Sequence, residues 1–149
     1  MRLLERDSAL ATLGELRAES AARGGRLVLV EGEAGLGKTS LLRTFRDSLP
    51  RGPKIAWGSC DPLTTPEPFE PLLDVAPGLD EGFAQLLHRH AGVSDVARAF
   101  LAALRYERGV VVLLDDLHWA DEATIDVLRF AARRIESTRG LGTVPFRAN

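Results

Sequence analysis

The chain has 149 residues, a formal net charge of −2 at pH 7 and a pI near 5.9. This length suits one ordinary domain, which buries about 70% of the surface of its unfolded chain. Nucleic-acid surfaces are made of clustered Lys and Arg, so a slightly acidic chain is a poor candidate for one. We therefore expect no direct nucleic-acid binding by this segment.

The hydrophobic pattern excludes a membrane protein. The longest purely apolar run, Val110–Leu114, is far too short for a bilayer span, and charge returns at Glu5 after a brief apolar start. Cys60 is the single cysteine, which excludes an internal disulfide and suits a reducing compartment. We expect a soluble, cytoplasmic protein.

A helix and a strand are the first elements in chain order. Leucines recur at three-residue steps between positions 10 and 16, which predicts a helix capped by Asp7 or Ser8 and ending at 24–25. The β-branched and leucine residues at 27–30 predict a strand.

A phosphate-binding pattern follows this strand directly. Residues 32–39 read G-x-x-x-x-G-K-T, in which glycines let backbone N–H groups face an anion, and a helix predicted from Ser40 to about Leu49 adds its positive dipole end. Lys38 can reach the β- and γ-phosphates, and the Thr39 hydroxyl can help to hold Mg²⁺. The alternative, a glycine-rich turn that only joins strand to helix, is disfavoured by this context. The predicted nucleotide-binding residues are Gly32, Glu33, Ala34, Gly35, Leu36, Gly37, Lys38, Thr39 and Ser40.

The middle of the chain predicts a short strand at 54–60 and then a loop. Four prolines at 61–71 predict an extended loop near the nucleotide. A short helix at 69–75 and clearer helices at 81–91 and 94–107 follow.

Two acidic residues follow the apolar run Val110–Leu114, which has no alternation and therefore predicts a parallel strand buried on both faces. Ligands bind at the carboxyl edge of such sheets. We predict that Asp115 holds Mg²⁺ through water, and that Asp116 orients or deprotonates an attacking water in a catalytic pair with Lys38. A pair of solvated or helix-capping acids is the weaker alternative.

Asp121 then predicts the cap of a helix from Glu122 to about Ser137. The residues expected to face the sheet are Ile125, Leu128, Ala131, Ala132 and Ile135. Together these elements predict a single α/β domain over 1–149 with a P-loop NTPase fold, in which helices flank a parallel sheet in three layers.

Two segments carry a family resemblance: Gly-Glu-Ala-Gly-Leu-Gly-Lys-Thr at 32–39 and Leu-Leu-Asp-Asp-Leu-His-Trp-Ala-Asp at 113–121. With 58–63 and 71–74, they resemble the AAA-type ATPase module of large LuxR-family transcriptional regulators, which belong to the STAND class and are similar to Orc1-like AAA domains. The resemblance covers residues 1–139. It implies ATP and Mg²⁺ as ligands, a nucleotide-dependent conformational switch, and DNA binding by a C-terminal helix-turn-helix that this sequence does not contain.

The resemblance also implies a later strand that ends in a sensor segment. Residues 140–149 carry two glycines, and Pro145 falls on the expected polar residue, which predicts a poor central strand. We interpret the chain as incomplete at its C-terminus, without its last strands and lid, and with Phe146–Arg147 as a remnant of the sensor.

Three functions stay open at this point. The first is an ATP-binding switch with slow or no hydrolysis. The second is a P-loop phosphotransferase such as a small-molecule kinase, which the wide spacing between Lys38 and Asp115 disfavours because it leaves room for an extra strand. The third is a non-catalytic remnant that binds a partner through an uncovered sheet edge. Oligomerisation stays open as well.

Overall fold

The computed structural model describes residues 3–23, 26–30, 37–52, 54–60, 67–106, 109–135 and 141–145. In these ranges the strands form a parallel sheet in the order β1-β4-β3-β2. The strands are β1 (Arg26–Val30), β2 (Ile55–Ser59), β3 (Val111–Asp115) and β4 (Leu141–Pro145). The helices are α1 (Leu3–Arg23), α2 (Lys38–Ser48), α3 (Glu70–Leu79), α4 (Glu81–His88), α5 (Val93–Tyr106), α6 (Glu122–Ala132) and the 3₁₀ turn η1 (Leu117–Trp119).

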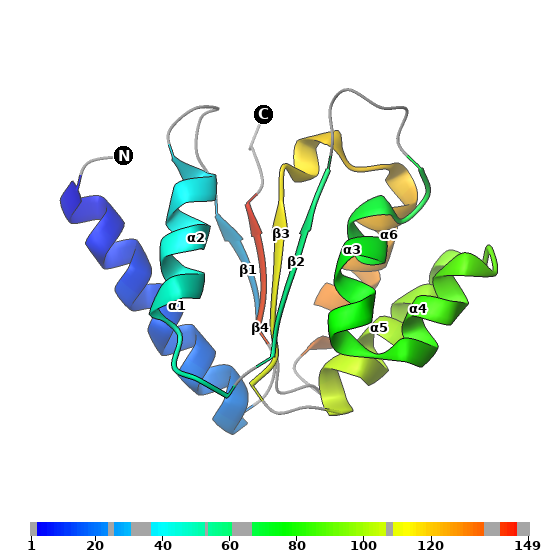
Figure 1. Ribbon diagram of the computed structural model, residues 1–149, viewed down its shortest axis with the longest axis horizontal. Helices are drawn as coiled ribbons and strands as arrows, with labels where there is room; N and C mark the ends of the chain where they lie inside the picture. Colours follow the sequence, from blue (N-terminus) through cyan, green and yellow to red (C-terminus); the bar gives the residue numbers. More distant parts are fainter. Residues whose placement is uncertain are drawn as a thin grey trace.

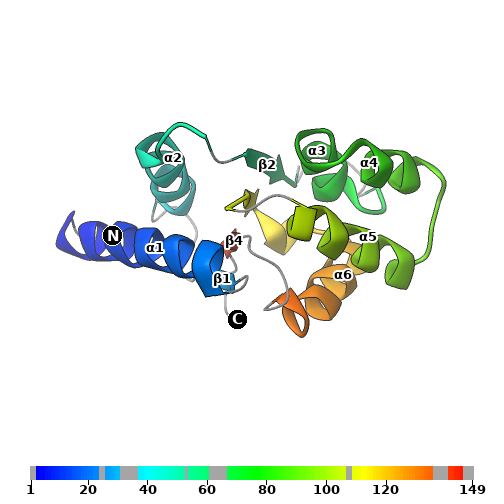
Figure 2. The same ribbon diagram turned by 90° about the horizontal axis from the view of Figure 1, so that it is seen from below.

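Helices cover both faces of this sheet. α1 and α2 lie on one face, and α3 to α6 lie on the other (Figures 1 and 2). All five residues of β3 are buried, as expected for a strand that is covered on both faces. Val111 and Leu113 pack on the α1–α2 side, whereas Val112 and Leu114 pack on the α3–α6 side. The predicted α/β class is therefore confirmed, and the arrangement is compatible with a P-loop NTPase-like fold.

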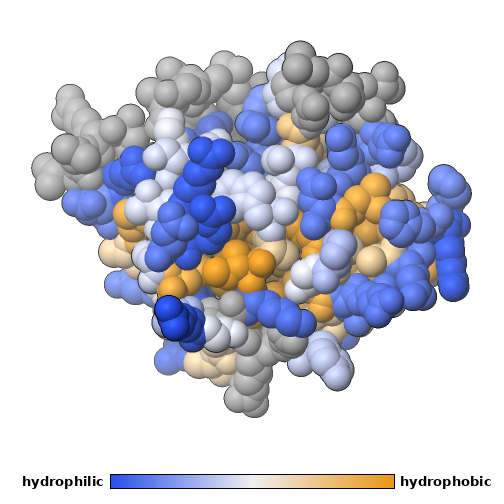
Figure 3. Space-filling model, viewed as in Figure 1, coloured by the Kyte–Doolittle hydropathy of each residue, from blue (hydrophilic) through white to orange (hydrophobic). Residues whose placement is uncertain are grey.

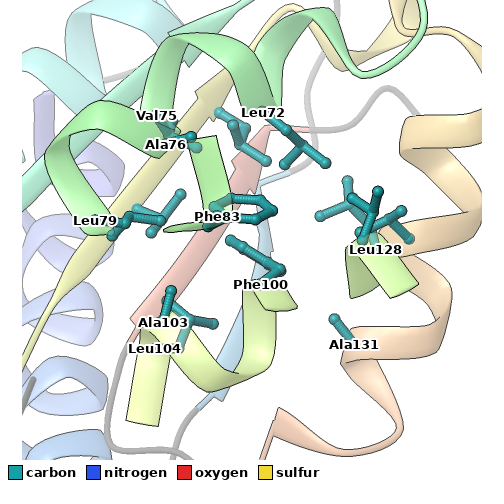
Figure 4. Close-up of a cluster of buried hydrophobic side chains, with 14 of the residues drawn as sticks. Leu72, Val75, Ala76, Leu79, Phe83, Phe100, Ala103, Leu104, Leu128 and Ala131 are labelled. Carbon is teal, nitrogen blue, oxygen red and sulfur yellow. The ribbon is translucent and has the colours of Figure 1, made fainter. Parts of the chain in front are cut away.

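The described residues form two hydrophobic clusters, and the larger, which we call the large cluster, lies beneath α3 to α6. Figure 4 shows Phe83 of α4 and Phe100 of α5 near its middle, with their ring centroids 5.8 Å apart. Leu72 and Leu104 are fully buried there. Burial of one such side chain stabilises the fold by roughly 1.5–3 kcal/mol, so this cluster is the main source of hydrophobic stabilisation on that face.

Helix α3 corrects two predictions. It begins at Glu70, inside the loop predicted over 61–71, and it continues past the predicted end at 75 to Leu79. Pro71 fits because the first turn of a helix needs no backbone N–H, and Pro77 lies near the end of the helix. Residues 61–66 of the predicted loop lie outside the described residues.

The close approach of α3 to β2 depends on Gly58. A Cβ atom added there would lie 2.4 Å from the carbonyl oxygen of Pro71. The backbone N–H of Ser59 also donates to Oδ2 of Asp74, with N and O 3.2 Å apart. Helix α3 is therefore fixed on β2 by both shape and a hydrogen bond.

Helix α1 begins earlier than predicted. It starts at Leu3, so Asp7 and Ser8 lie inside the helix and neither caps it. Arg6 in its first turns contacts α2, and such tertiary contacts override a local capping signal. In the described part of the chain, no helix combines the length and apolarity that crossing a membrane requires.

Helix α6 is shorter than predicted and turned slightly about its axis. It ends at Ala132, which is exposed, and Ile125 is only half-buried. Leu128, Ala131 and Ile135 are buried as predicted, and Thr124 and Val127 are fully buried beside them. The predicted cap is confirmed, because the Asp121 side chain accepts the backbone N–H of Thr124.

Strand β4 overturns the prediction that residues after 140 make a poor central strand. It lies between β1 and β3, with Val28 opposite Thr143 and Val30 opposite Pro145. Pairing with β3 extends only to Thr143, so the proline interrupts hydrogen bonding at the end of the strand alone. The strand that the resemblance implied after α6 is therefore present, whereas Phe146–Arg147 lie outside the described residues.

Strand β2 forms one edge of the sheet. Ile55 and Trp57 are half-buried there, and the Arg46 guanidinium of α2 lies 5.4 Å from the centroid of the Trp57 ring. The edge formed by β2 is thus partly covered by a cation–π contact. In Figure 3 hydrophobic residues show mainly in the middle of the molecule, between the outer helices, which are largely hydrophilic.

Candidate nucleotide-binding site

The predicted site residues that the structure describes, Lys38, Thr39, Ser40, Asp115 and Asp116, lie at the carboxyl edge of the sheet. Ser59 at the end of β2 is the register partner of Asp115 at the end of β3. In Figure 1 these strand ends and the first turn of α2 lie along the upper rim of the sheet. Two motifs that are far apart in sequence therefore meet at one edge, as expected for a parallel α/β sheet.

The phosphate-loop residues are described from Gly37 onward; Gly32, Glu33, Ala34, Gly35 and Leu36 lie outside the described residues. Gly37 has a φ of 81° and is the N-cap of α2, which is a conformation that favours glycine. Its carbonyl oxygen accepts the backbone N–H of Leu41 at 2.8 Å. Lys38, Thr39 and Ser40 therefore form the first turn of α2, where the positive end of the helix dipole lies.

The acidic pair ends β3 in a tight turn. Asp115 is only 4% exposed, and its Oδ1 accepts the backbone N–H of Asp116 with N and O 2.9 Å apart. Asp116 has a φ of 55°, which an Asp tolerates better than most residues, and its carbonyl oxygen accepts the N–H of Trp119 at 2.9 Å. The Asp115 carboxylate is thus oriented by the backbone of the next residue.

Electrostatics joins the two motifs. Burial raises the pKa of the Asp116 carboxyl above its ordinary value, and the neighbouring Asp115 raises this pKa further. His118 and Lys38 lower the same pKa. Lys38 at the start of α2 is therefore within electrostatic reach of Asp116.

His118 was not among the predicted site residues. It lies beside Trp119, with ring centroids 5.1 Å apart, and Trp119 is 46% exposed. Its position three residues after Asp115 in a 3₁₀ turn brings it near the acidic pair, and a one-turn element of this kind gives no clear periodic signal in a sequence.

The donor atoms at this edge fit Mg²⁺. The Asp115 carboxylate and the Thr39 hydroxyl are oxygen donors of the kind that this cation prefers, and a divalent cation would relieve the crowding of two carboxylates. The described residues hold no group of three or more His, Cys, Asp and Glu that could bind a metal alone. Phosphate oxygens and water would complete the coordination, which is how Mg²⁺ is usually held beside nucleotides.

Cys60 lies next to this edge without being reactive. It is 3% exposed, and its backbone N–H donates to the Asp115 carbonyl oxygen at 3.3 Å. Burial is the main cause that raises the pKa of its thiol to about 12, and nearby carboxylates such as Glu70 and Asp121 add to it. A thiol that stays protonated is a poor nucleophile, so Cys60 is a poor candidate for a catalytic residue.

The family follows from a comparison with known proteins. Residues 2–144 match the family described as "AAA ATPase domain". The chain belongs to the AAA ATPase domain family. The AAA-type resemblance seen in the sequence is thereby confirmed, and membership indicates nucleotide binding.

One relative of this AAA domain is an uncharacterized protein from Rhizobium meliloti (strain 1021). The two are 29% identical over 177 aligned positions, which cover 89% of this chain and 17% of the relative. The chain therefore spans about one sixth of the length of the relative it matches.

Proposed function

We propose that this AAA domain binds ATP with Mg²⁺ and serves as the nucleotide-dependent switch of a signal-transduction ATPase. The observation that carries the proposal is the meeting of Lys38, at the start of α2, with Asp116, at the end of β3, within electrostatic reach at one edge of the sheet. The resemblance to large LuxR-family regulators of the STAND class supports the regulatory part of the proposal. DNA binding is not assigned to this segment.

Each residue of the site has a role in this proposal. Backbone N–H groups of the loop 32–37 surround the phosphates, and Lys38 contacts the β- and γ-phosphates. Thr39 and Asp115 hold Mg²⁺, which when bound would neutralise charge on the phosphate oxygens. Asp116 orients an attacking water.

The decisive measurement is calorimetric titration of Mg-ATP into the wild type and the variant Lys38→Ala. Charge-assisted hydrogen bonds contribute about 1.5–3 kcal/mol each, so the variant should bind roughly ten- to a hundredfold more weakly. Lys54→Ala is the matched control. Lys54 immediately precedes β2 and so lies at the amino ends of the strands, whereas the proposed site lies at their carboxyl ends. If Lys38→Ala and Lys54→Ala both bind Mg-ATP with the dissociation constant of the wild type, the assignment of the phosphate loop is wrong.

Hydrolysis by this domain should be slow. Asp116 carries a carboxylate one methylene shorter than the glutamate of many hydrolytic relatives, and an arginine supplied from outside such a site accelerates transfer by about 10³–10⁵. We expect single-turnover hydrolysis at well under about 0.01 per second. A rate of about 1 per second that Asp116→Asn abolishes and Asp126→Asn leaves intact would show that the domain is a complete ATPase.

A further inference from the structure

The Asp121 carboxylate binds donors from two elements that are far apart in the sequence. Its Oδ2 accepts the backbone N–H of Thr124 at 3.0 Å and that of Phe69 at 3.2 Å, and its Oδ1 accepts the Thr124 hydroxyl at 2.6 Å. The bonds to Thr124 cap α6, but the bond to Phe69 has no part in capping that helix. Asp121 therefore also ties the start of α6 to the residue that precedes α3.

Phe69 needs such a partner. It has a φ of 63°, a left-handed conformation that is strained for a bulky aromatic residue, yet its side chain is only 6% exposed. Its carbonyl oxygen accepts the N–H groups of both Leu72 and Leu73 at 2.9 Å, so it forms the first turn of α3. The N–H of Phe69 donates to the Asp121 carboxylate, and this hydrogen bond holds the start of α3.

We call the hydrogen bond between Asp121 and Phe69 the tether. On the Asp121 side, the tether is separated from the acidic pair by only a short turn. Between Asp116 and Asp121 lies only η1, in which the N–H of Ala120 donates to the carbonyl oxygen of Leu117 at 2.9 Å. Leu117 is 2% exposed and belongs to the large cluster. The turn from 116 to 120 is thus held by β3 at one end and by Asp121 at the other.

We propose that Asp121 is a positioning residue for the metal-binding end of the site. By fixing the turn 116–120 against the start of α3, its carboxylate keeps Asp115 and Asp116 in the geometry that Mg-ATP requires, and it acts without contacting the nucleotide. The inference rests on the proposed function, because it concerns how the same site is held in place.

Two substitutions separate the tether from the cap. Asp121→Ser keeps a side-chain oxygen that can cap α6, but one short hydroxyl cannot also accept the N–H of Phe69. Asp121→Asn keeps an oxygen in the place of Oδ2 for both N–H groups and an amide that can donate to the Thr124 hydroxyl. The serine variant should therefore lose the tether, and the asparagine variant should retain it.

Asp80→Ser is the matched control. Asp80 caps α4 by accepting the N–H of Phe83 at 2.9 Å. It follows the last residue of α3, at the opposite end of that helix from Phe69. The same substitution at this cap removes a comparable carboxylate without touching the turn 116–120. Any loss of nucleotide affinity that follows from general destabilisation should appear equally in both serine variants.

The experiment measures ATP binding by calorimetry with and without Mg²⁺, together with amide hydrogen exchange of residues 67–73 in the absence of nucleotide. Loss of one buried hydrogen bond should weaken Mg-ATP binding to Asp121→Ser about tenfold, with Mg²⁺-free ATP binding within about twofold of the wild type. Asp121→Asn and Asp80→Ser should bind Mg-ATP within about 1.5-fold of the wild type, which is less than the loss of one hydrogen bond would cause. The Phe69 amide should exchange faster only in Asp121→Ser.

Equal Mg-ATP affinities of Asp121→Ser and Asp80→Ser would overturn the inference while leaving the proposed function standing. A wild type that does not bind Mg-ATP overturns the proposed function and the inference together. If circular dichroism shows that Asp121→Ser is unfolded, the variant Thr124→Val tests the inference in its place. This variant removes the hydroxyl that orients the Asp121 carboxylate, and it keeps the backbone N–H groups of Thr124 and Phe69 as donors. It should weaken Mg-ATP binding by about two- to threefold, and an unchanged Mg²⁺ dependence would overturn the inference.

Discussion

The two faces of the sheet are built differently. On the α3–α6 face, the large cluster joins four helices to Val112 and Leu114 of β3. On the α1–α2 face, we call the second cluster the small cluster, and among the residues whose side chains the structure describes its buried members are Leu13, Leu42, Phe45, Val111 and Leu113. Helix α2, which carries Lys38 and Thr39, packs on the small cluster.

We infer from this difference that α3 to α6 form the scaffold of the domain and that α2 is the ligand-binding element. Local stability follows the amount of buried apolar contact, so we expect the two helices α1 and α2 to open more readily than the four packed helices α3 to α6 on the other face. A ligand that binds only the folded state stabilises it by mass action. Mg-ATP, which contacts the start of α2 in the proposed function, should therefore add most to the stability of the weaker face.

The sharpest test of this comparison uses two adjacent leucines on β3. Leu113 faces the small cluster and Leu114 the large one, and both are fully buried. Replacement of a buried leucine by alanine costs about 2–5 kcal/mol, with higher values where the surroundings cannot collapse into the cavity. We expect about 4 kcal/mol for Leu114→Ala and about 2.5 kcal/mol for Leu113→Ala, measured by urea unfolding.

The strand context, solvent exposure and change in volume are the same for both variants, so each is the control for the other. A loss for Leu113→Ala that equals or exceeds that for Leu114→Ala would show that the small cluster is packed as tightly as the large one. The proposed division into scaffold and ligand-binding element would then be wrong.

The sequence predicted the parts of the site that depend on contiguous residues. Glycine at the N-cap of α2, Lys38 after it, and two acids at the end of a buried strand each follow from local chemistry, and the structure brings these elements to one edge. The strand β3 was equally predictable, because a strand buried on both faces must be apolar throughout.

The remaining features depend on contacts between distant segments. Asp121 was predictable as a helix cap, but its bond to Phe69 spans 52 residues and leaves no local pattern. Strand β4 has a composition that disfavours a central strand, yet its backbone pairs with both β1 and β3. Cooperative pairing in the middle of a sheet thus outweighed the intrinsic preference of Gly142 and Pro145.

The smallest expected effect concerns how α1 is held on the weaker face. Arg6 donates from Nη2 to the Ser40 carbonyl oxygen at 3.0 Å, to the Ser40 hydroxyl at 2.9 Å, and to the Thr44 hydroxyl. These acceptors lie in the first turns of α2, beside Lys38 and Thr39. No local sequence motif marks an arginine that forms hydrogen bonds to another helix, so this role of Arg6 could not be predicted from the sequence.

We expect Arg6→Ala to lower the free energy of unfolding by about 1 kcal/mol and to weaken Mg-ATP binding by about two- to fourfold, since the first turn of α2 loses a support. Arg6→Lys should lose most of the same stability, because an ammonium lacks the planar fork of a guanidinium. All three acceptors are neutral, so the loss should be the same in low and high salt, unlike that of an ion pair. Arg43→Ala, an exposed arginine of α2, is the control and should change stability by less than about 0.5 kcal/mol. Equal stabilities of Arg6→Ala and Arg43→Ala would mean that the small cluster alone holds α1 against α2, and that the weaker face needs no polar support.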